Sequence, residues 1–185
     1  ELLKFRASWG INGNQEIGNY QFASTLSNGR WYTSGNGALL GTSPEFLPSP
    51  EIAWEESVQL DFAVDLALFN NRLTATVDYY NKETKGLLER IPVPGHVGVG
   101  PPVANVGSVA NKGVEMSINW RESTDNINYS LGFNGALNNN EITEIGSPII
   151  GASWAIAGPV TRAEIGQPIA YFYGYKTEGI FQTPA

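Results

Sequence analysis

The sequence predicts an all-β fold, an antiparallel meander of about five to six strands that forms part of a large transmembrane β-barrel with long extracellular loops. Apolar and polar residues alternate with a period of two over long stretches, which gives each strand two different faces. Short turns and long loops follow one another in alternation, as they do in membrane barrels. A barrel strand crosses a bilayer with only about 9–11 residues, so the lack of a long apolar run is compatible with this fold.

Composition narrows the classes of protein to consider. The chain has 185 residues, of which 21 are glycine and 16% are charged, and this suits an all-β chain rich in turns. Its formal net charge of -7 argues against a nucleic-acid binder, which would normally be basic. The absence of cysteine excludes disulfides and thiolate metal sites. No secretory signal precedes Glu1 and the chain starts inside a predicted strand, so we expect a piece of a longer protein.

The alternation defines the predicted strands in chain order. They are Leu2–Ile11, Ile52–Phe69, Arg72–Leu88, Val106–Arg121 and Asn126–Asn138, with Glu141–Ile145 as an extension of the fifth and Tyr171–Phe181 as a further strand. In the second strand, every other residue from Val58 to Leu68 is a large apolar one, and the residues between them are smaller or polar. One face of each strand is therefore apolar and the other is more polar.

The connections differ in length at the two ends of the strands. Asn70-Asn71 predicts a tight turn, because asparagine tolerates the positive φ that hairpin turns require. Glu122–Asp125 predicts a second short connection. Long segments rich in Gly and Pro predict loops at about 12–51, 89–105 and 140–170. If the short turns lie on the periplasmic side, these loops lie outside the cell.

This orientation assigns an environment to each strand residue. Lipid-facing positions are predicted at Leu60, Phe62, Val64, Val77, Ile118 and Leu131, and lumen-facing positions at Asp61, Asp65, Asp78 and Glu115. Trp9 and Trp54 are predicted near the outer membrane interface, and Trp120 and Tyr129 near the inner one, as aromatic girdles. The alternative is that Trp and Tyr are enriched here as they are in any strand.

The sequence predicts no catalytic, cofactor or metal site, and therefore no enzyme. His96 is the sole histidine and lies among Pro and Gly in a predicted loop, so a histidine metal cluster is excluded. A catalytic carboxylate pair needs a defined separation across a substrate. The four lumen-facing carboxylates are better explained as charges lining a wet barrel interior.

Four stretches of the chain carry a resemblance to a known family. They read LKFRASWGINGNQEIGNYQ (3–21), LFNNRLTATVDYYNKETKGLL (68–88), NVGSVANKGVEMSINWR (105–121) and YFYGYKTEGIFQ (171–182). In this order they resemble the SusC/RagA-type TonB-dependent outer-membrane transporters of Bacteroidetes. The segments 22–49 and 147–160 carry no such pattern, as expected of outer loops that vary with substrate.

The resemblance implies a plugged barrel of about 22 strands in the outer membrane. It implies import of oligosaccharides or peptides, energised by the TonB complex through a plug domain, with a SusD-like lipoprotein as a lid on the outer loops. The plug, the segment that contacts TonB and the carboxy-terminal closing strands are not found in this sequence, so we expect 1–185 to be a partial barrel wall.

The resemblance also gives the loop aromatics a role. Trp31 and Tyr32 in the first long loop and Trp154 in the third are candidates to contact the ligand or the lid, since aromatic rings pack well against sugar rings. The alternative is that they anchor the loops.

A soluble all-β sandwich that binds carbohydrate is the competing interpretation. A sandwich also has strands with one apolar face and turns at regular intervals. The two folds differ in where the apolar faces go. In a sandwich Leu60, Phe62 and their neighbours would be buried against a second sheet, whereas in a barrel they form one outward belt.

Overall fold

The computed structural model describes residues 1–35, 37–147, 149–150, 153–154, 158–176 and 179, with the backbone alone for the short strands between 149 and 159. Five long antiparallel strands form one sheet in the order β1-β4-β5-β6-β7. They are β1 (Leu2–Asn14), β4 (Glu55–Leu68), β5 (Leu73–Arg90), β6 (Val103–Ser123) and β7 (Asn128–Glu144). The predicted all-β meander is therefore confirmed, and each predicted strand differs from the observed one at its ends.

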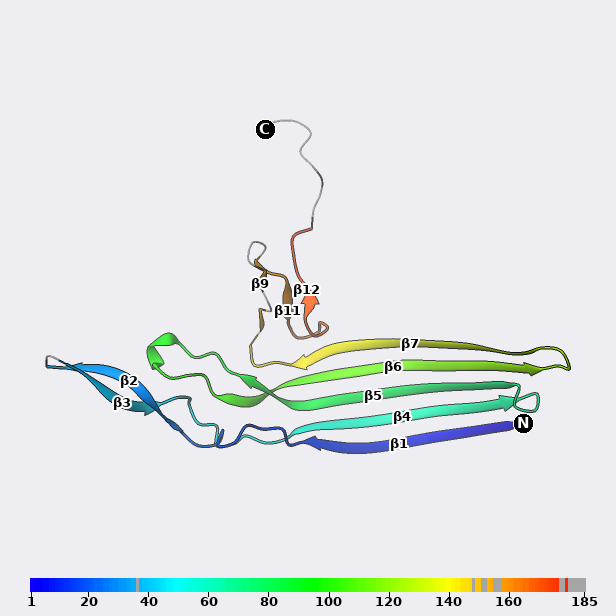
Figure 1. Ribbon diagram of the computed structural model, residues 1–185, viewed down its shortest axis with the longest axis horizontal. Helices are drawn as coiled ribbons and strands as arrows, with labels where there is room; N and C mark the ends of the chain where they lie inside the picture. Colours follow the sequence, from blue (N-terminus) through cyan, green and yellow to red (C-terminus); the bar gives the residue numbers. More distant parts are fainter. Residues whose placement is uncertain (36, 148, 151–152, 155–157, 177–178, 180–185) are drawn as a thin grey trace.

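The two ends of the sheet are built differently (Figure 1). At one end, which we call the turn end, residues 69–72 join β4 to β5 and residues 124–127 join β6 to β7. At the opposite end, which we call the loop end, lie segments 15–54 and 91–102 and the chain after β7. The alternation of short and long connections that the sequence predicts is thus present.

The tight turn forms where the sequence predicts it. Phe69, Asn70 and Asn71 have φ angles of 53°, 56° and 65°, and the Arg72 N–H donates to the Phe69 carbonyl at 3.1 Å. Asparagine enters this left-handed region more readily than most residues, which explains the central pair. Positive φ at Phe69 was not expected, because a bulky aromatic residue rarely adopts it.

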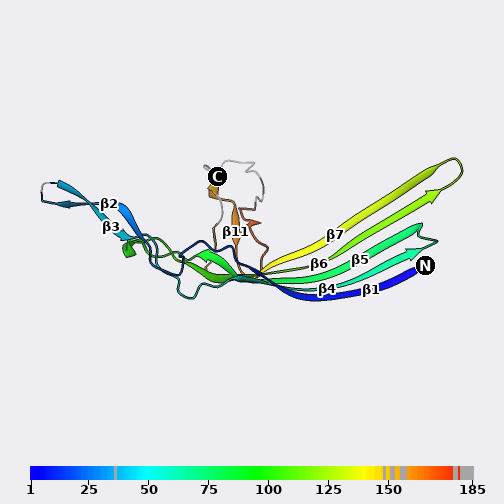
Figure 2. The ribbon, with the colours of Figure 1, turned by 60° about the horizontal axis from the view of Figure 1, so that its bottom comes forward.

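The sheet is a single layer, and Figure 2 shows its strands lying beside one another with a continuous bend. Among the described residues, the buried apolar side chains are few: Ala63, Ala67, Val109 and Ile142. Phe5 and Phe62 remain 72% and 49% exposed. A sandwich would bury these rings between two sheets, so the sandwich interpretation is not the observed architecture.

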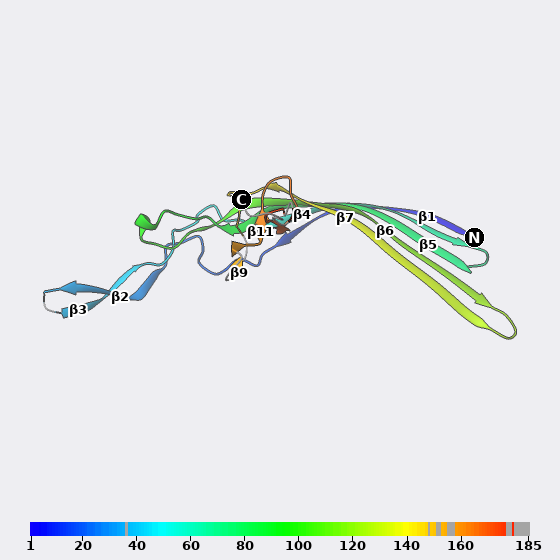
Figure 3. The same ribbon diagram turned by 90° about the horizontal axis from the view of Figure 1, so that it is seen from above.

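Segment 12–51, predicted as a loop, contains regular structure. β1 runs on to Asn14, and β2 (Leu26–Ser34) pairs with β3 (Gly37–Pro44) as a separate antiparallel hairpin. This hairpin projects beyond the loop end of the sheet (Figure 3). Segment 89–105 contains the short 3₁₀ helix η1 (Gly95–Val97), which includes His96.

The segment after β7 forms short strands at the loop end. β8 (Ile149–Ile150), β11 (Thr161–Ala163) and β12 (Tyr171–Phe172) make a small sheet, and β9 (Ser153–Trp154) pairs with β10 (Gly158–Pro159). The extension of the fifth strand is confirmed as far as Glu144. Of the predicted strand Tyr171–Phe181, only Tyr171–Phe172 is a strand, residues 173–176 are not, and most of the remainder lies outside the described residues.

Candidate functional site

The candidate functional surface is the five-stranded sheet itself, because its two faces carry opposite chemistry. Cross-strand register aligns apolar residues in rows, such as Phe5 with Val64 and Val77 with Met116. We call the whole set the apolar belt. Its members are Leu3, Phe5, Ala7, Trp9, Ile11, Val58, Leu60, Phe62, Val64, Leu66, Leu68, Leu73, Ala75, Val77, Tyr79, Val114, Met116, Ile118, Trp120, Tyr129, Leu131, Phe133, Gly135 and Leu137.

The apolar belt is uncovered in the described part of the chain. Phe62, Val77 and Leu131 are exposed, and Leu60, Val64 and Ile118 are half-buried by their neighbours in the same layer. All six positions predicted to face lipid lie on the face of the sheet that carries the belt. A continuous patch of this size is unusual on a soluble monomer and indicates a surface that meets something apolar.

The belt is slanted across the strands. At the edge of the belt nearer the loop end, cross-strand register places Ile11 of β1 level with Glu141 of β7, yet the belt on β7 already stops at Leu137, four residues away. Strands tilted by about 40° and spaced by about 4.8 Å would shift a membrane-parallel band by about one residue per strand. The observed slant matches that tilt.

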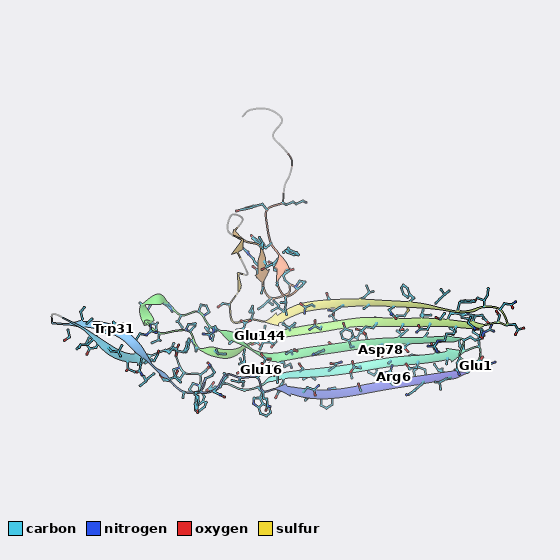
Figure 4. The ribbon with its side chains drawn as sticks, in the orientation of Figure 1. Glu1, Arg6, Glu16, Trp31, Asp78 and Glu144 are labelled. Carbon is cyan, nitrogen blue, oxygen red and sulfur yellow. The ribbon has the colours of Figure 1, made fainter. Side chains whose placement is uncertain are left out.

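The opposite face is polar and internally bonded. Arg6 donates from Nε and Nη2 to the two Asp65 oxygens, at 2.8 and 3.0 Å, and from Nη2 to Asp78 at 3.1 Å. Asp61 accepts hydrogen bonds from Ser8 and Gln59. Figure 4 shows Arg6 and Asp78 along the middle of the sheet, on β1 and β5.

The four carboxylates predicted to face the lumen share this polar face. Cross-strand register places Asp78 directly opposite Glu115, and Asp65 accepts a further hydrogen bond from Thr76 at 3.1 Å. These groups lie at an accessible surface, so each ion pair contributes little to stability by itself. Their combined effect is to make this face compatible with water while the other face is not.

The predicted girdle residues lie near the two limits of the belt. The ring of Trp54, which precedes β4, lies against Gly13 near the loop end, where a Cβ on the glycine would approach Cε3 of the tryptophan at 3.2 Å. Trp9 is level with Leu60. Near the turn end, Trp120 is level with Leu131, and Tyr129 is level with Glu122.

The turn end holds a cluster that sequence reasoning missed. The rings of Phe69 and Trp120 have centroids 6.0 Å apart, and the Arg72 guanidinium lies over the Trp120 ring at 5.9 Å. Arg72 also forms an ion pair with Glu122. The aromatic–basic composition of the turn was the available signal, since such side chains combine an apolar body with a polar tip.

The loop aromatics are spread out. Trp31 and Tyr32 lie on β2 in the projecting hairpin, far from Arg6 and Asp78 (Figure 4), and are 70% and 55% exposed. Adjacent strand residues point to opposite faces, so the two rings lie on opposite sides of the hairpin. Trp31 is level with Leu40 on β3, and Tyr32 is level with Leu39. Trp154 lies in β9, where the structure describes backbone alone. The two described rings therefore do not form one shared platform.

The segment after β7 packs over the polar face at the loop end. A cavity of about 240 Å³ lies between β11 and the strands, and it is lined by Val109, Ile142, Arg162 and Glu89, among others. Burial raises the pKa of the Glu89 carboxyl.

Within the described residues, no group of three His, Cys, Asp or Glu side chains is arranged to hold a metal ion. None of the described helices is long and apolar enough to span a lipid bilayer.

Comparisons with known proteins all point to TonB-dependent receptors. Residues 2–171 match the family model of the TonB dependent receptor-like β-barrel. The chain is 35% identical over 182 residues to TonB-dependent receptor P39 of Formosa agariphila, which covers 98% of this chain and 17% of that protein. It is 29% identical over 148 residues to TonB-dependent receptor SusC of Bacteroides thetaiotaomicron, covering 77% of this chain and 15% of SusC.

Solved structures show the same arrangement. The chain superposes on the RagAB peptide transporter with a TM-score of 0.73 and 31% identity, over 92% of this chain and 18% of that one. It superposes on the RagAB peptide importer in the open-open state with a TM-score of 0.72 and 32% identity, over 90% of this chain and 18% of that one. The chain thus spans less than a fifth of the length of these relatives.

Proposed function

Because the chain belongs to the TonB-dependent receptor-like β-barrel family and is of the SusC/RagA type, we propose that it forms part of the wall of an outer-membrane importer. The importer takes up oligosaccharides or peptides, is energised by the TonB complex, and works with a SusD-like surface lipoprotein. It lies in the outer membrane of a member of the Bacteroidetes. Its role is transport, without chemical conversion of the cargo.

The slanted apolar belt is the observation that carries this proposal. No described part of the chain covers the belt, its slant is the one expected for tilted barrel strands, and the opposite face of the sheet carries hydrogen-bonded charges. In the proposed setting, the belt contacts lipid through Leu60, Phe62, Val64, Val77, Ile118 and Leu131, and Trp9, Trp54, Trp120 and Tyr129 lie at the membrane interfaces. Asp61, Asp65, Asp78 and Glu115 face the lumen.

The loop end is the proposed outer side. The outer segments correspond to the loops expected at about 12–51, 89–105 and 140–170. The exposed hairpin β2–β3 offers Trp31 to the cargo or the lipoprotein lid, with Tyr32 on its other face. Trp154 of the third outer segment is the remaining candidate for such contact.

Deletion of the hairpin tests this assignment. In the full-length parent, replacing residues 26–44 with a short Gly-Ser linker should leave assembly in the outer membrane intact, because no belt residue is removed. TonB-dependent uptake of a labelled oligosaccharide or oligopeptide pool should fall strongly. The parent measured with and without TonB is the control. Normal uptake after the deletion would exclude the hairpin from capture, and TonB-independent uptake by the parent would refute the importer assignment.

A further inference from the structure

At the loop end the pairing of β4 with β5 stops, and the backbone groups beyond it need other partners. The last aligned pair is Glu56 with Lys85. Gly86 then adopts a φ of 66°, and the register between β5 and β6 shifts on either side of Leu87. This is a β-bulge, which leaves ladder groups of β5 unpaired. Side chains must therefore supply hydrogen-bond partners for these backbone groups of β5.

Asn105 supplies such partners. Its Nδ2 donates to the Ala53 carbonyl at 2.8 Å and to the Gly86 carbonyl at 2.7 Å, and its Oδ1 accepts from the Ala53 N–H at 2.8 Å. A side-chain amide with both N–H groups and its oxygen engaged behaves like an extra rung of the ladder. Asn105 on β6 thereby joins β5 to the end of segment 15–54.

Glu55, at the start of β4, accepts two further hydrogen bonds at the same end of the sheet. Its Oε1 accepts from the Leu88 N–H at 3.0 Å, and its Oε2 accepts from Asn14 Nδ2 at 3.0 Å. The bulge, the end of β1 and the start of β4 are therefore held by two polar side chains. We call Asn105, Glu55, Ala53 and Gly86 the loop-end clasp.

A second junction links segment 15–54 to the outer segment 91–102. Phe46 and Gly100 form a parallel bridge, in which the Gly100 N–H donates to the Glu45 carbonyl at 2.8 Å and the Leu47 N–H donates to the Gly100 carbonyl at 3.1 Å. A Cβ on Gly100 would lie 2.5 Å from Cδ1 of Phe46 and 2.9 Å from the Glu45 carbonyl oxygen, so a larger residue would require the ring and the backbone to shift. Segment 15–54 is thus held to β5 and β6 by the clasp and to segment 91–102 by this bridge.

We propose that Asn105 is a positioning residue that fixes the β2–β3 hairpin relative to the sheet. The hairpin is carried by segment 15–54, whose return to the sheet is held at Ala53, and this return is bonded to both β5 and β6 through one side chain. The clasp does not depend on the proposed function. Its consequence does: if the hairpin captures cargo, Asn105 sets the orientation in which the hairpin is presented.

The test uses the full-length protein in lipid, with spin labels at Thr33→Cys on the hairpin and Lys112→Cys on β6. N105D is close to isosteric and keeps one acceptor, but it replaces the two donors with an oxygen that faces two carbonyls. We expect assembly at the parental level, a broader inter-label distance distribution, and roughly tenfold faster amide exchange of Ala53, as expected when about two hydrogen bonds are lost. N119D, the same change elsewhere on β6, should alter none of these.

The outcomes separate the inference from the proposed function. An unchanged distance distribution in N105D would overturn the positioning role. Failure of N105D to assemble would also overturn it, because Asn105 would then be required for the barrel rather than for the hairpin. A broadened distribution with normal cargo uptake would support the clasp and contradict the role of the hairpin in capture.

Discussion

The two faces of the five-stranded sheet are made by the same strands, yet they are stabilised in opposite ways. On the polar face, Arg6 of β1 donates to Asp65 of β4 and to Asp78 of β5, which links three strands. On the apolar face, Phe62 and Leu131 project away from the sheet with no protein cover in the described residues. The polar face is thus satisfied within the sheet, whereas the apolar face depends on its surroundings. This difference is the reason for proposing that lipid contacts the apolar face alone.

The largest expected effect comes from placing a charge within the belt. Phe62→Asp in the full-length parent should abolish outer-membrane assembly, because a carboxylate would face hydrocarbon without a partner. Asp61→Asn, one residue away on the polar face, should assemble at the parental level. The measurement is the amount of heat-modifiable protein in isolated outer membranes. Equal tolerance at the two positions would reject the assignment of faces.

A second pair of neighbours measures the size of the difference. Phe133 lies in the middle of the belt on β7, and Asn134 lies beside it on the polar face; both side chains are exposed. Phe133→Arg should destabilise the assembled barrel by roughly 2–4 kcal/mol if the site is near the bilayer midplane. Asn134→Arg should change the free energy of unfolding much less. Denaturant unfolding in vesicles would report both, and a larger effect at Asn134 would contradict the assignment of the two faces.

The smallest effect is expected from the polar face itself. Arg6→Gln removes the ion pairs to Asp65 and Asp78, but these groups lie at an accessible surface and water can replace the arginine. We expect normal assembly and a slight loss of thermal stability that shrinks at high salt. Melting curves at low and high ionic strength would show this, and an assembly failure like that of Phe62→Asp would show instead that the network is essential.

The sheet could be predicted from the sequence because its signal is a simple period. Alternation predicts the strands and their faces, since successive side chains of a strand point to opposite sides. Asn70-Asn71 predicts the turn, since asparagine tolerates a positive φ. The hairpin β2–β3 was missed because β2 lacks an alternation of apolar and polar residues: its two aromatic residues, Trp31 and Tyr32, are adjacent and so lie on opposite faces. A bulge between Asn28 and Arg30 interrupts what pattern remains.

The loop-end clasp could not be read from periodicity, because Asn105 acts through hydrogen bonds to backbone from distant parts of the chain. A glycine within a strand pattern often marks a bulge, so Gly86 was the available signal. Gly86 indicates where the pairing of the strands is interrupted, but it does not show which side chain bonds the unpaired backbone groups. Likewise, the slant of the belt needs the cross-strand register, which a list of strands does not contain.

The apolar belt, which no described residue covers, has a consequence for how this protein tolerates substitution. In a packed interior, trimming a side chain leaves a void that rigid neighbours cannot fill, and that void adds to the loss of stability. Beside Phe5 or Leu137 in the proposed setting, mobile acyl chains would flow into the space. Leu, Phe, Val and Met should therefore be nearly interchangeable at these positions, so that selection maintains their hydrophobicity but not their exact shape.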